Sequence, residues 1–187
     1  MKRWIPWLVL WMAAALSGAP AGACVGKTLV VGAVQSPEGQ VVAQVIAILI
    51  NERTGTTVKI EDFADADTLH EGLTSGRVDI GVEHVGRALG RLQLPVPGDD
   101  EEAYRRVKSA YLESLNLVWL PPLGFHRVGA GLAAPVARKD TLKKFPALPR
   151  LIAKTRGLLP DEVLAGLLRE EEASRAARQL LRDKKLI

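Results

Sequence analysis

The sequence predicts an α/β fold in which helices flank a mostly parallel sheet of about five strands. Between residues 27 and 82, short apolar runs rich in Val and Ile alternate with segments whose apolar residues recur at helical spacing. Gly55 and Gly76 follow the first two helical segments, where glycine commonly ends a helix. The order strand, helix, strand, helix, strand implies parallel pairing with right-handed crossovers.

The first strand and helix are expected at the start of this alternation. Residues 27–34 form an apolar run typical of a strand that is buried on both faces. Residues 35–38 (QSPE) turn the chain into a helix that Thr54 and Gly55 end. Two rows of apolar residues at i, i+4 spacing give this helix a wide apolar stripe that other elements must cover. The rows are Val41, Val45 and Leu49, and Val42, Ile46 and Ile50.

The next elements follow with almost no residues left for loops. Residues 56–63 are expected to form the second strand and residues 67–75 a short helix capped by Gly76. Residues 78–82 form the third strand, and a further helix reaches Arg91. Ligands of open α/β sheets bind beyond the carboxyl ends of the strands, so the end of this third strand is a candidate binding edge.

The second half begins with a helix over residues 99–115, whose acidic first turn suits the positive end of the helix dipole. Strands are expected at residues 117–120 and 125–133, on either side of Pro121 and Pro122. From Arg138 onward the pattern is helical. We expect it to be broken at Pro146, at Pro149 and at residues 157–160, and we expect the final helix at residues 170–185.

Residues 1–23 have the features of an export signal. Lys2 and Arg3 precede an apolar stretch of about 13 residues, which is shorter than the roughly 20 residues that a membrane-spanning helix needs. Cys24, the only cysteine, directly follows the small residues of this signal, so the segment suits both lipid acylation at Cys24 and plain cleavage. We therefore expect an exported protein with one domain, residues 24–187, and no disulfide.

Composition and motifs exclude several classes of function. A formal net charge of +4 is a small excess rather than a basic patch, which makes nucleic acid an unsuitable partner. No phosphate loop, nucleotide-binding glycine motif, nucleophile elbow or cysteine pair occurs, so we expect no enzymatic activity and no cofactor. Glu83, His84 and His126 lack the spacing of a metal site, so we expect no bound metal. His70, inside the short helix, is expected to be structural.

Three segments resemble the substrate-binding proteins of osmoprotectant ABC importers. They are residues 28–32 (TLVVG) with Glu38, residues 70–80 (HEGLTSGRVDI) and residues 116–125 (NLVWLPPLGF). The helical tail is similar too. Members of that family bind glycine betaine, choline, carnitine and related quaternary amines. The resemblance implies one lobe of a type II periplasmic-binding-protein-like fold, an ABC permease as partner, and a place in the periplasm or on the outer face of the cell membrane.

The sequence departs from that family in two ways. Family members are two-lobed clamps, whereas residues 134–139 here continue almost directly into the final helices, so this chain resembles a single lobe. The aromatic residues that hold a quaternary ammonium are replaced as well: Gly81 and His84 stand where tyrosines are usual, and His126 and Arg127 follow Phe125. We therefore expect weak or altered ligand binding.

A set of polar residues marks the expected cleft edge and its ligand, a small zwitterion or anion. The candidate ligand-binding residues are Gln35, Ser36, Glu38, Glu83, His84, His126 and Arg127. An alternative hypothesis is an interaction module without catalytic activity, which docks on a transporter, on a two-lobed binding protein, or on a second copy that supplies the missing wall. In either case, contact with the membrane is expected only through a lipid on Cys24.

Overall fold

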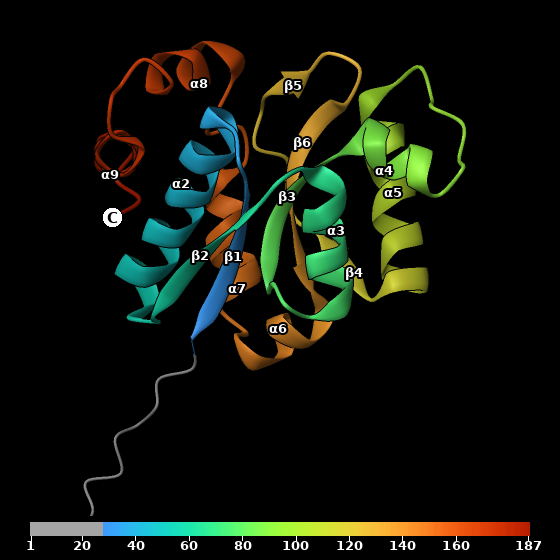
Figure 1. Ribbon diagram of the computed structural model, residues 1–187, viewed down its shortest axis with the longest axis horizontal. Coiled ribbons are helices and arrows are strands. Elements are labelled where there is room, and N and C mark those ends of the chain that lie inside the picture. The colour runs from blue at the N-terminus through green and yellow to red at the C-terminus, as the bar shows by residue number, and fades with distance from the viewer. Residues whose placement is uncertain (1–27) are drawn as a thin grey trace, which may run out of the picture.

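The computed structural model describes residues 28–187, which form a single open sheet between two layers of helices (Figure 1). The strand order is β2-β1-β3-β6-β4, and β5 pairs with β6 outside this path. The strands are β1 (Leu29–Val34), β2 (Val58–Phe63), β3 (Ile80–His84), β4 (Leu117–Trp119), β5 (His126–Arg127) and β6 (Gly131–Arg138). The expected α/β class is confirmed.

Five of the six described strands point the same way, in keeping with the expected mostly parallel sheet, and only β6 runs against them. Strand β1 pairs in parallel with β2, in register from Leu29 opposite Val58 to Val34 opposite Phe63, and in parallel with β3. Strand β6 lies antiparallel to β3, β4 and β5. All three antiparallel pairings therefore involve this one strand.

The expected strand at residues 125–133 is instead a hairpin. A turn after Arg127 separates the two residues of β5 from β6, which extends to Arg138. Gly129 and Gly131 have φ angles of 74° and 76°, a left-handed conformation that glycine adopts without the steric cost of a Cβ atom. These two glycines therefore reverse the chain where a continuous strand was expected.

The helices have the expected positions, with small differences at their ends. They are α2 (Pro37–Thr54), α3 (Ala66–Ser75), α4 (Val85–Arg91), α5 (Asp100–Leu115), α6 (Lys139–Lys144), α7 (Leu148–Ile152), the 3-10 helix η2 (Ala153–Thr155), α8 (Asp161–Leu167) and α9 (Ala173–Asp183). The helical tail is thus confirmed. Pro149 does not break a helix, however, because it lies in the first turn of α7, where its missing N–H costs nothing.

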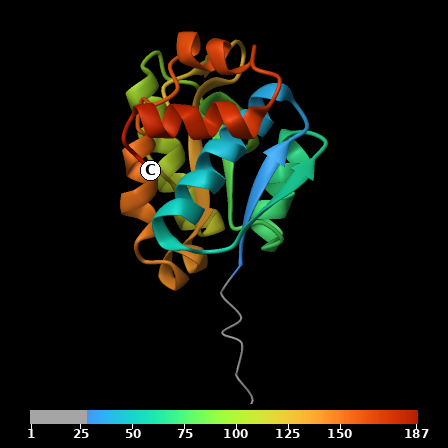
Figure 2. The same ribbon diagram turned by 90° about the vertical axis from the view of Figure 1, so that its left-hand side faces the viewer.

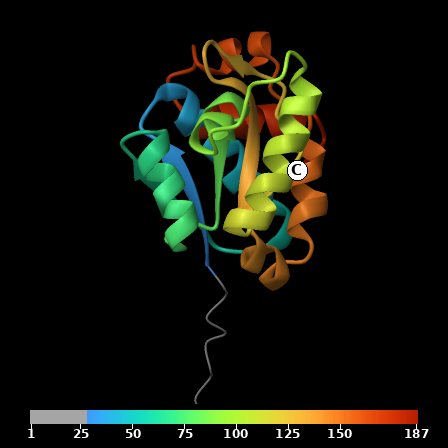
Figure 3. The ribbon, with the colours of Figure 1, turned by 90° about the vertical axis from the view of Figure 1, so that its right-hand side faces the viewer.

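Each face of the sheet has its own apolar core. One contains the buried face of α2 together with residues of α7 and α9, such as Ile152 and Leu181. Figure 2 shows α9 crossing α2 on the outside of this layer. The other contains residues of α3, α4 and α5, among them Leu69, Leu89 and Tyr111, and Figure 3 shows this side. None of the helices within residues 28–187 is both long and apolar enough to span a membrane.

The start of α2 lies directly against the carboxyl end of β1. Ser36 caps the helix, because its hydroxyl oxygen accepts a hydrogen bond from the Gly39 amide at 3.0 Å. A Cβ atom on Gly39 would lie 2.4 Å from the Val34 carbonyl oxygen, so only glycine permits this close approach. This packing brings the first turn of α2 to the edge where β1 and β3 end.

Candidate functional site

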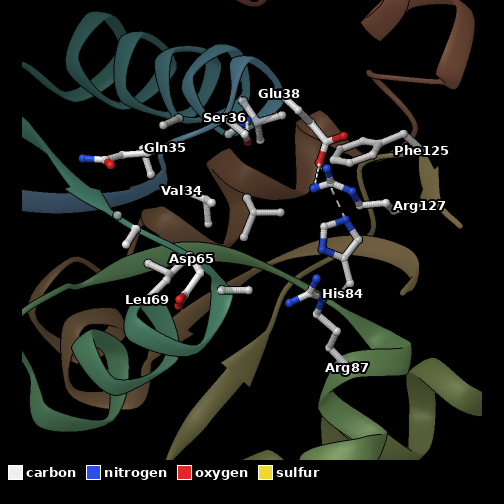
Figure 4. A pocket seen from close by; sticks show the side chains of 18 residues that line it. Val34, Gln35, Ser36, Glu38, Asp65, Leu69, His84, Arg87, Phe125 and Arg127 are labelled. Carbon is white, nitrogen blue, oxygen red and sulfur yellow. Dashed lines mark hydrogen bonds and ion pairs between the residues drawn. The ribbon is translucent and has the colours of Figure 1, made fainter. Parts of the chain in front are cut away.

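A cavity of about 310 Å³ lies at this edge, between the start of α2 and the carboxyl ends of β1 and β3. Such an edge is where open α/β sheets bind their ligands. Figure 4 shows polar side chains from four parts of the chain that converge on it. The polar residues are Gln35, Ser36, Glu38, Asp65, His84, Arg87 and Arg127, and Phe125 is the aromatic residue of the lining.

His84 is the most deeply buried polar side chain of this lining. It is 8 % exposed, and its ring lies edge-on to Phe125 with 5.9 Å between the ring centroids. Its Nε2 atom has no hydrogen-bond partner among the described residues. Burial, together with the positive charges of Arg127 and Arg87, lowers the pKa of His84 to about 4. The imidazole is therefore neutral at physiological pH and offers one donor and one acceptor.

Glu38 and Arg127 form a loose ion pair above this histidine. Arg127 Nη1 lies 3.5 Å from Glu38 Oε1, and the Arg127 side chain is 49 % exposed. The same Glu38 oxygen lies 3.8 Å from His84 Nε2, too far for a hydrogen bond. Burial and the two arginines therefore determine the pKa of His84.

Arg87 and Asp65 supply the other two charges. Arg87 lies in the first turn of α4 and forms no ion pair with any residue in the range 28–187. Asp65 caps α3, where its carboxylate accepts hydrogen bonds from the Asp67 and Thr68 amides. The hydrogen bonds from the Thr68 amide and hydroxyl lower the pKa of Asp65, so it remains ionised. The cavity thus has two guanidinium groups and two carboxylates.

Five of the seven residues named from the sequence line this cavity, and two lie elsewhere. The five are Gln35, Ser36, Glu38, His84 and Arg127. His126 lies on the hairpin, where its Nε2 is 2.8 Å from Asp100 at the start of α5. Glu83 points to the opposite face of the sheet, because successive side chains of a strand alternate between faces. The same alternation separates His126 from Arg127 in β5.

Glu83 belongs to a buried polar network behind the sheet. It is 2 % exposed, and its carboxylate lies 2.8 Å from His70 Nδ1 and 3.4 Å from Arg91 Nη1. Arg91 continues to the Asp67 carboxylate at 2.7 Å. The His70 ring packs edge-on against Tyr111. His70 thus has a hydrogen-bonded place in the core, and Glu83 connects α3 with α4 rather than facing the cavity.

Asp65 and Arg87 were not among the candidate residues, although each has a recognisable signal in the sequence. Asp65 directly follows a strand and precedes Thr68 by three residues, which is the spacing of a capping box at a helix start. Arg87 comes three residues after the end of β3, one helical turn beyond His84. Side chains in the first turn after a strand end lie at the ligand edge. Cys24 and the expected export signal lie outside the described residues.

The arrangement is chemically suited to holding charge rather than to binding a metal. No three His, Cys, Asp or Glu side chains of residues 28–187 lie close enough to hold a metal ion. Glu83, His84 and His126 lie at three separate places, as described above. Two cations, two anions and a neutral imidazole instead provide hydrogen bonds for a small molecule that has both charges.

The chain is similar in sequence to substrate-binding components of ABC importers. The family model for the substrate binding domain of the ABC-type glycine betaine transport system matches residues 27–130. The carnitine transport binding protein OpuCC of Listeria monocytogenes is 30 % identical over 121 residues, 63 % of this chain. The matched region spans only 38 % of that relative's length. The resemblance noted in the sequence is thereby confirmed.

Solved structures share the fold. A crystal structure described as a glycine betaine/carnitine/choline ABC transporter superposes with a TM-score of 0.78 at 13 % identity, over 86 % of this chain and 98 % of that chain. Apo YehZ from Escherichia coli gives a TM-score of 0.70 at 12 % identity, over 86 % of this chain and 100 % of that chain. At such low identities the likeness concerns the fold alone.

Proposed function

The chain belongs to the family of substrate binding domains of ABC-type glycine betaine transport systems, and we propose that it captures a small zwitterionic or anionic solute at one wall of its sheet for an ABC importer. The observation that supports this proposal is the convergence of Glu38, His84, Arg87 and Arg127 on the cavity at the carboxyl edge of the sheet. In this role the protein binds its solute and performs no reaction.

Capture at this site is weak because the ligand has a single wall. Strand β6 ends at Arg138 and α6 begins at Lys139, so no second lobe is inserted where the sequence departs from the two-lobed family members. Binding sites for small molecules usually bury 70–90% of the ligand surface, whereas one wall leaves much of the ligand in water. We expect dissociation constants in the millimolar range.

The aromatic content of the site argues for a changed ligand preference. A quaternary ammonium is held mainly by the faces of aromatic rings. Phe125 is the single aromatic ring in the lining, and it is 1 % exposed, so almost none of its face is available. The charged groups around it therefore dominate recognition.

The proposal includes export and a membrane permease as partner. Val128, next to Arg127 in the turn of the hairpin, is fully exposed, so a partner that docks over the cavity would contact it. A lipid on Cys24 would hold the protein close to that permease.

The test is an NMR titration of the purified protein, which detects millimolar binding, with glycine betaine, choline, carnitine and glycine. We expect saturable shifts of the amides of Ser36, Glu38, His84 and Arg87 with at least one of these solutes. His84→Gln should reduce these shifts, because it removes the buried ring from the cavity wall. The absence of saturable shifts at these amides with every solute would refute capture at this site.

A further inference from the structure

The charges of the cavity specify its ligand more closely than the family does. Two guanidinium groups and two carboxylates line it, so its formal charges balance. A ligand with a single charge would leave one pair of these groups without a counterpart. A zwitterion provides both, which makes it the ligand class that this lining fits best.

The ion pair between Glu38 and Arg127 is long and weak, so a ligand can separate the two side chains. Its 3.5 Å separation is long for a charge-assisted hydrogen bond, and half of the Arg127 side chain is exposed. Exposed ion pairs of this kind contribute roughly 0–1 kcal/mol to stability. A ligand that offers a better partner to each side chain can therefore separate them at little cost.

His84 indicates what kind of group belongs beside Glu38. Its Nε2 atom is buried and has no partner among residues 28–187, while Glu38 Oε1 lies 3.8 Å away. Buried polar atoms in proteins are normally hydrogen-bonded, so the missing partner points to a ligand group. When the proton of the neutral ring is on Nδ1, Nε2 is the acceptor, so a ligand nitrogen with N–H groups can donate to Nε2 and to the Glu38 carboxylate together.

A fully methylated nitrogen cannot satisfy these acceptors. It has no N–H group, it leaves Nε2 without a partner, and it requires aromatic faces that Phe125 does not offer. We propose that the solute of this site is a small amino acid whose nitrogen retains N–H groups, with its ammonium bound by Glu38 and His84 and its carboxylate by Arg87 and Arg127. This inference rests on the proposed function and specifies its substrate class.

The test uses glycine, N-methylglycine, N,N-dimethylglycine and glycine betaine, which share a carboxylate and differ in the number of N–H groups. NMR titration of the purified protein should show affinity falling along this series, with glycine bound at least about tenfold more tightly than glycine betaine. Glu38→Gln should remove most of this preference. Arg87→Gln should lower the affinities for glycine, N-methylglycine and N,N-dimethylglycine together.

The matched control is Glu101→Gln, which removes a carboxylate from the first turn of α5, away from the cavity, just as Glu38→Gln removes one from the first turn of α2. It should leave all four affinities unchanged. Equal affinities along the series, or tighter binding of glycine betaine, would overturn this inference and leave solute capture intact. Binding of none of the four would overturn the inference, and failure of choline and carnitine as well would refute capture itself.

Discussion

At the end of β3, two neighbouring residues belong to opposite layers of the molecule. His84 faces α2 and lines the cavity, whereas Glu83 faces α3 and α4 and lies in a buried ion-pair network. The strand period of two residues imposes this division on any consecutive pair. Of these two residues, only His84 changes the charge of the cavity wall when it is protonated.

The low pKa of His84 predicts a specific dependence of stability on pH. It is about 4 in the native protein, against a reference value of 6.5. Between these pH values the unfolded chain binds a proton that the native protein does not. The free energy of unfolding should therefore fall as the pH is lowered from 6.5 to about 4, by at most about 1.4 kcal/mol per pH unit from this residue.

Urea unfolding of the protein and of His84→Gln at several pH values checks this prediction. Other titrating groups are common to both proteins, so the difference between their free energies of unfolding isolates His84. That difference should be constant above pH 6.5 and change across the acidic window. A constant difference down to pH 4 would show that His84 keeps an ordinary pKa in the native protein.

At the scale of elements, the buried carboxylate of Glu83 joins β3 to the helices on one face. It contacts His70 of α3 and Arg91 of α4, and Arg91 also binds the carbonyl oxygen of Ala66 at 2.9 Å. Burial is the largest single effect on Arg91 and lowers its pKa, but the attraction of Glu83, the hydrogen bond to Asp67 and the contribution of Tyr111 together outweigh burial and raise the pKa. This network therefore positions α3 and α4, whose first turns contribute to the cavity.

Glu83→Gln should lower the free energy of unfolding by about 3 kcal/mol, because it removes the buried carboxylate that both His70 and Arg91 contact and leaves Arg91 with only the exposed Asp67 as its anionic partner. Glu113→Gln, an exposed position on α5, is the control and should change stability by less than about 0.5 kcal/mol. Chemical denaturation measures both. A glycine affinity that fell in Glu83→Gln, with stability unchanged, would instead place Glu83 in the binding site.

At the scale of the whole molecule, the final helix completes the core that supports α2. Leu181 of α9 is fully buried in the same apolar cluster as Ile46 and Leu49 of α2. The start of α2 in turn supplies Ser36 and Glu38 to the cavity. The last residues of the chain thus stabilise a wall of the site that begins more than a hundred residues earlier.

Leu181→Ala should destabilise the protein by about 2–5 kcal/mol, the usual cost of removing a buried leucine side chain. Leu168→Ala, at a residue that is 39 % exposed, is the control and should cost much less. Thermal and urea unfolding measure both variants. A small effect of Leu181→Ala would mean that α9 unfolds separately from the core around α2.

The local elements were predictable because their signals are local. The apolar stripe of α2, its N-cap Ser36 and its stop at Gly55 all lie within one stretch of chain, and the structure places the helix there. The hairpin at residues 126–138 was not anticipated, because β6 extends to Arg138 by pairing with β3 and β4, which lie far away in the sequence. The strand propensities of single residues do not predict which strands pair with one another.

The sequence by itself determined the α/β class, the order of elements, the family, and the edge of the sheet where polar residues gather. Apolar periodicity, glycine stops and family motifs are all written along the chain. The tertiary structure decided which polar residues face one another. It separated Glu83 and His126 from His84 and brought Arg87 and Asp65 to the cavity. Strand alternation and helix placement act in three dimensions, so only the folded chain shows which charges face the ligand.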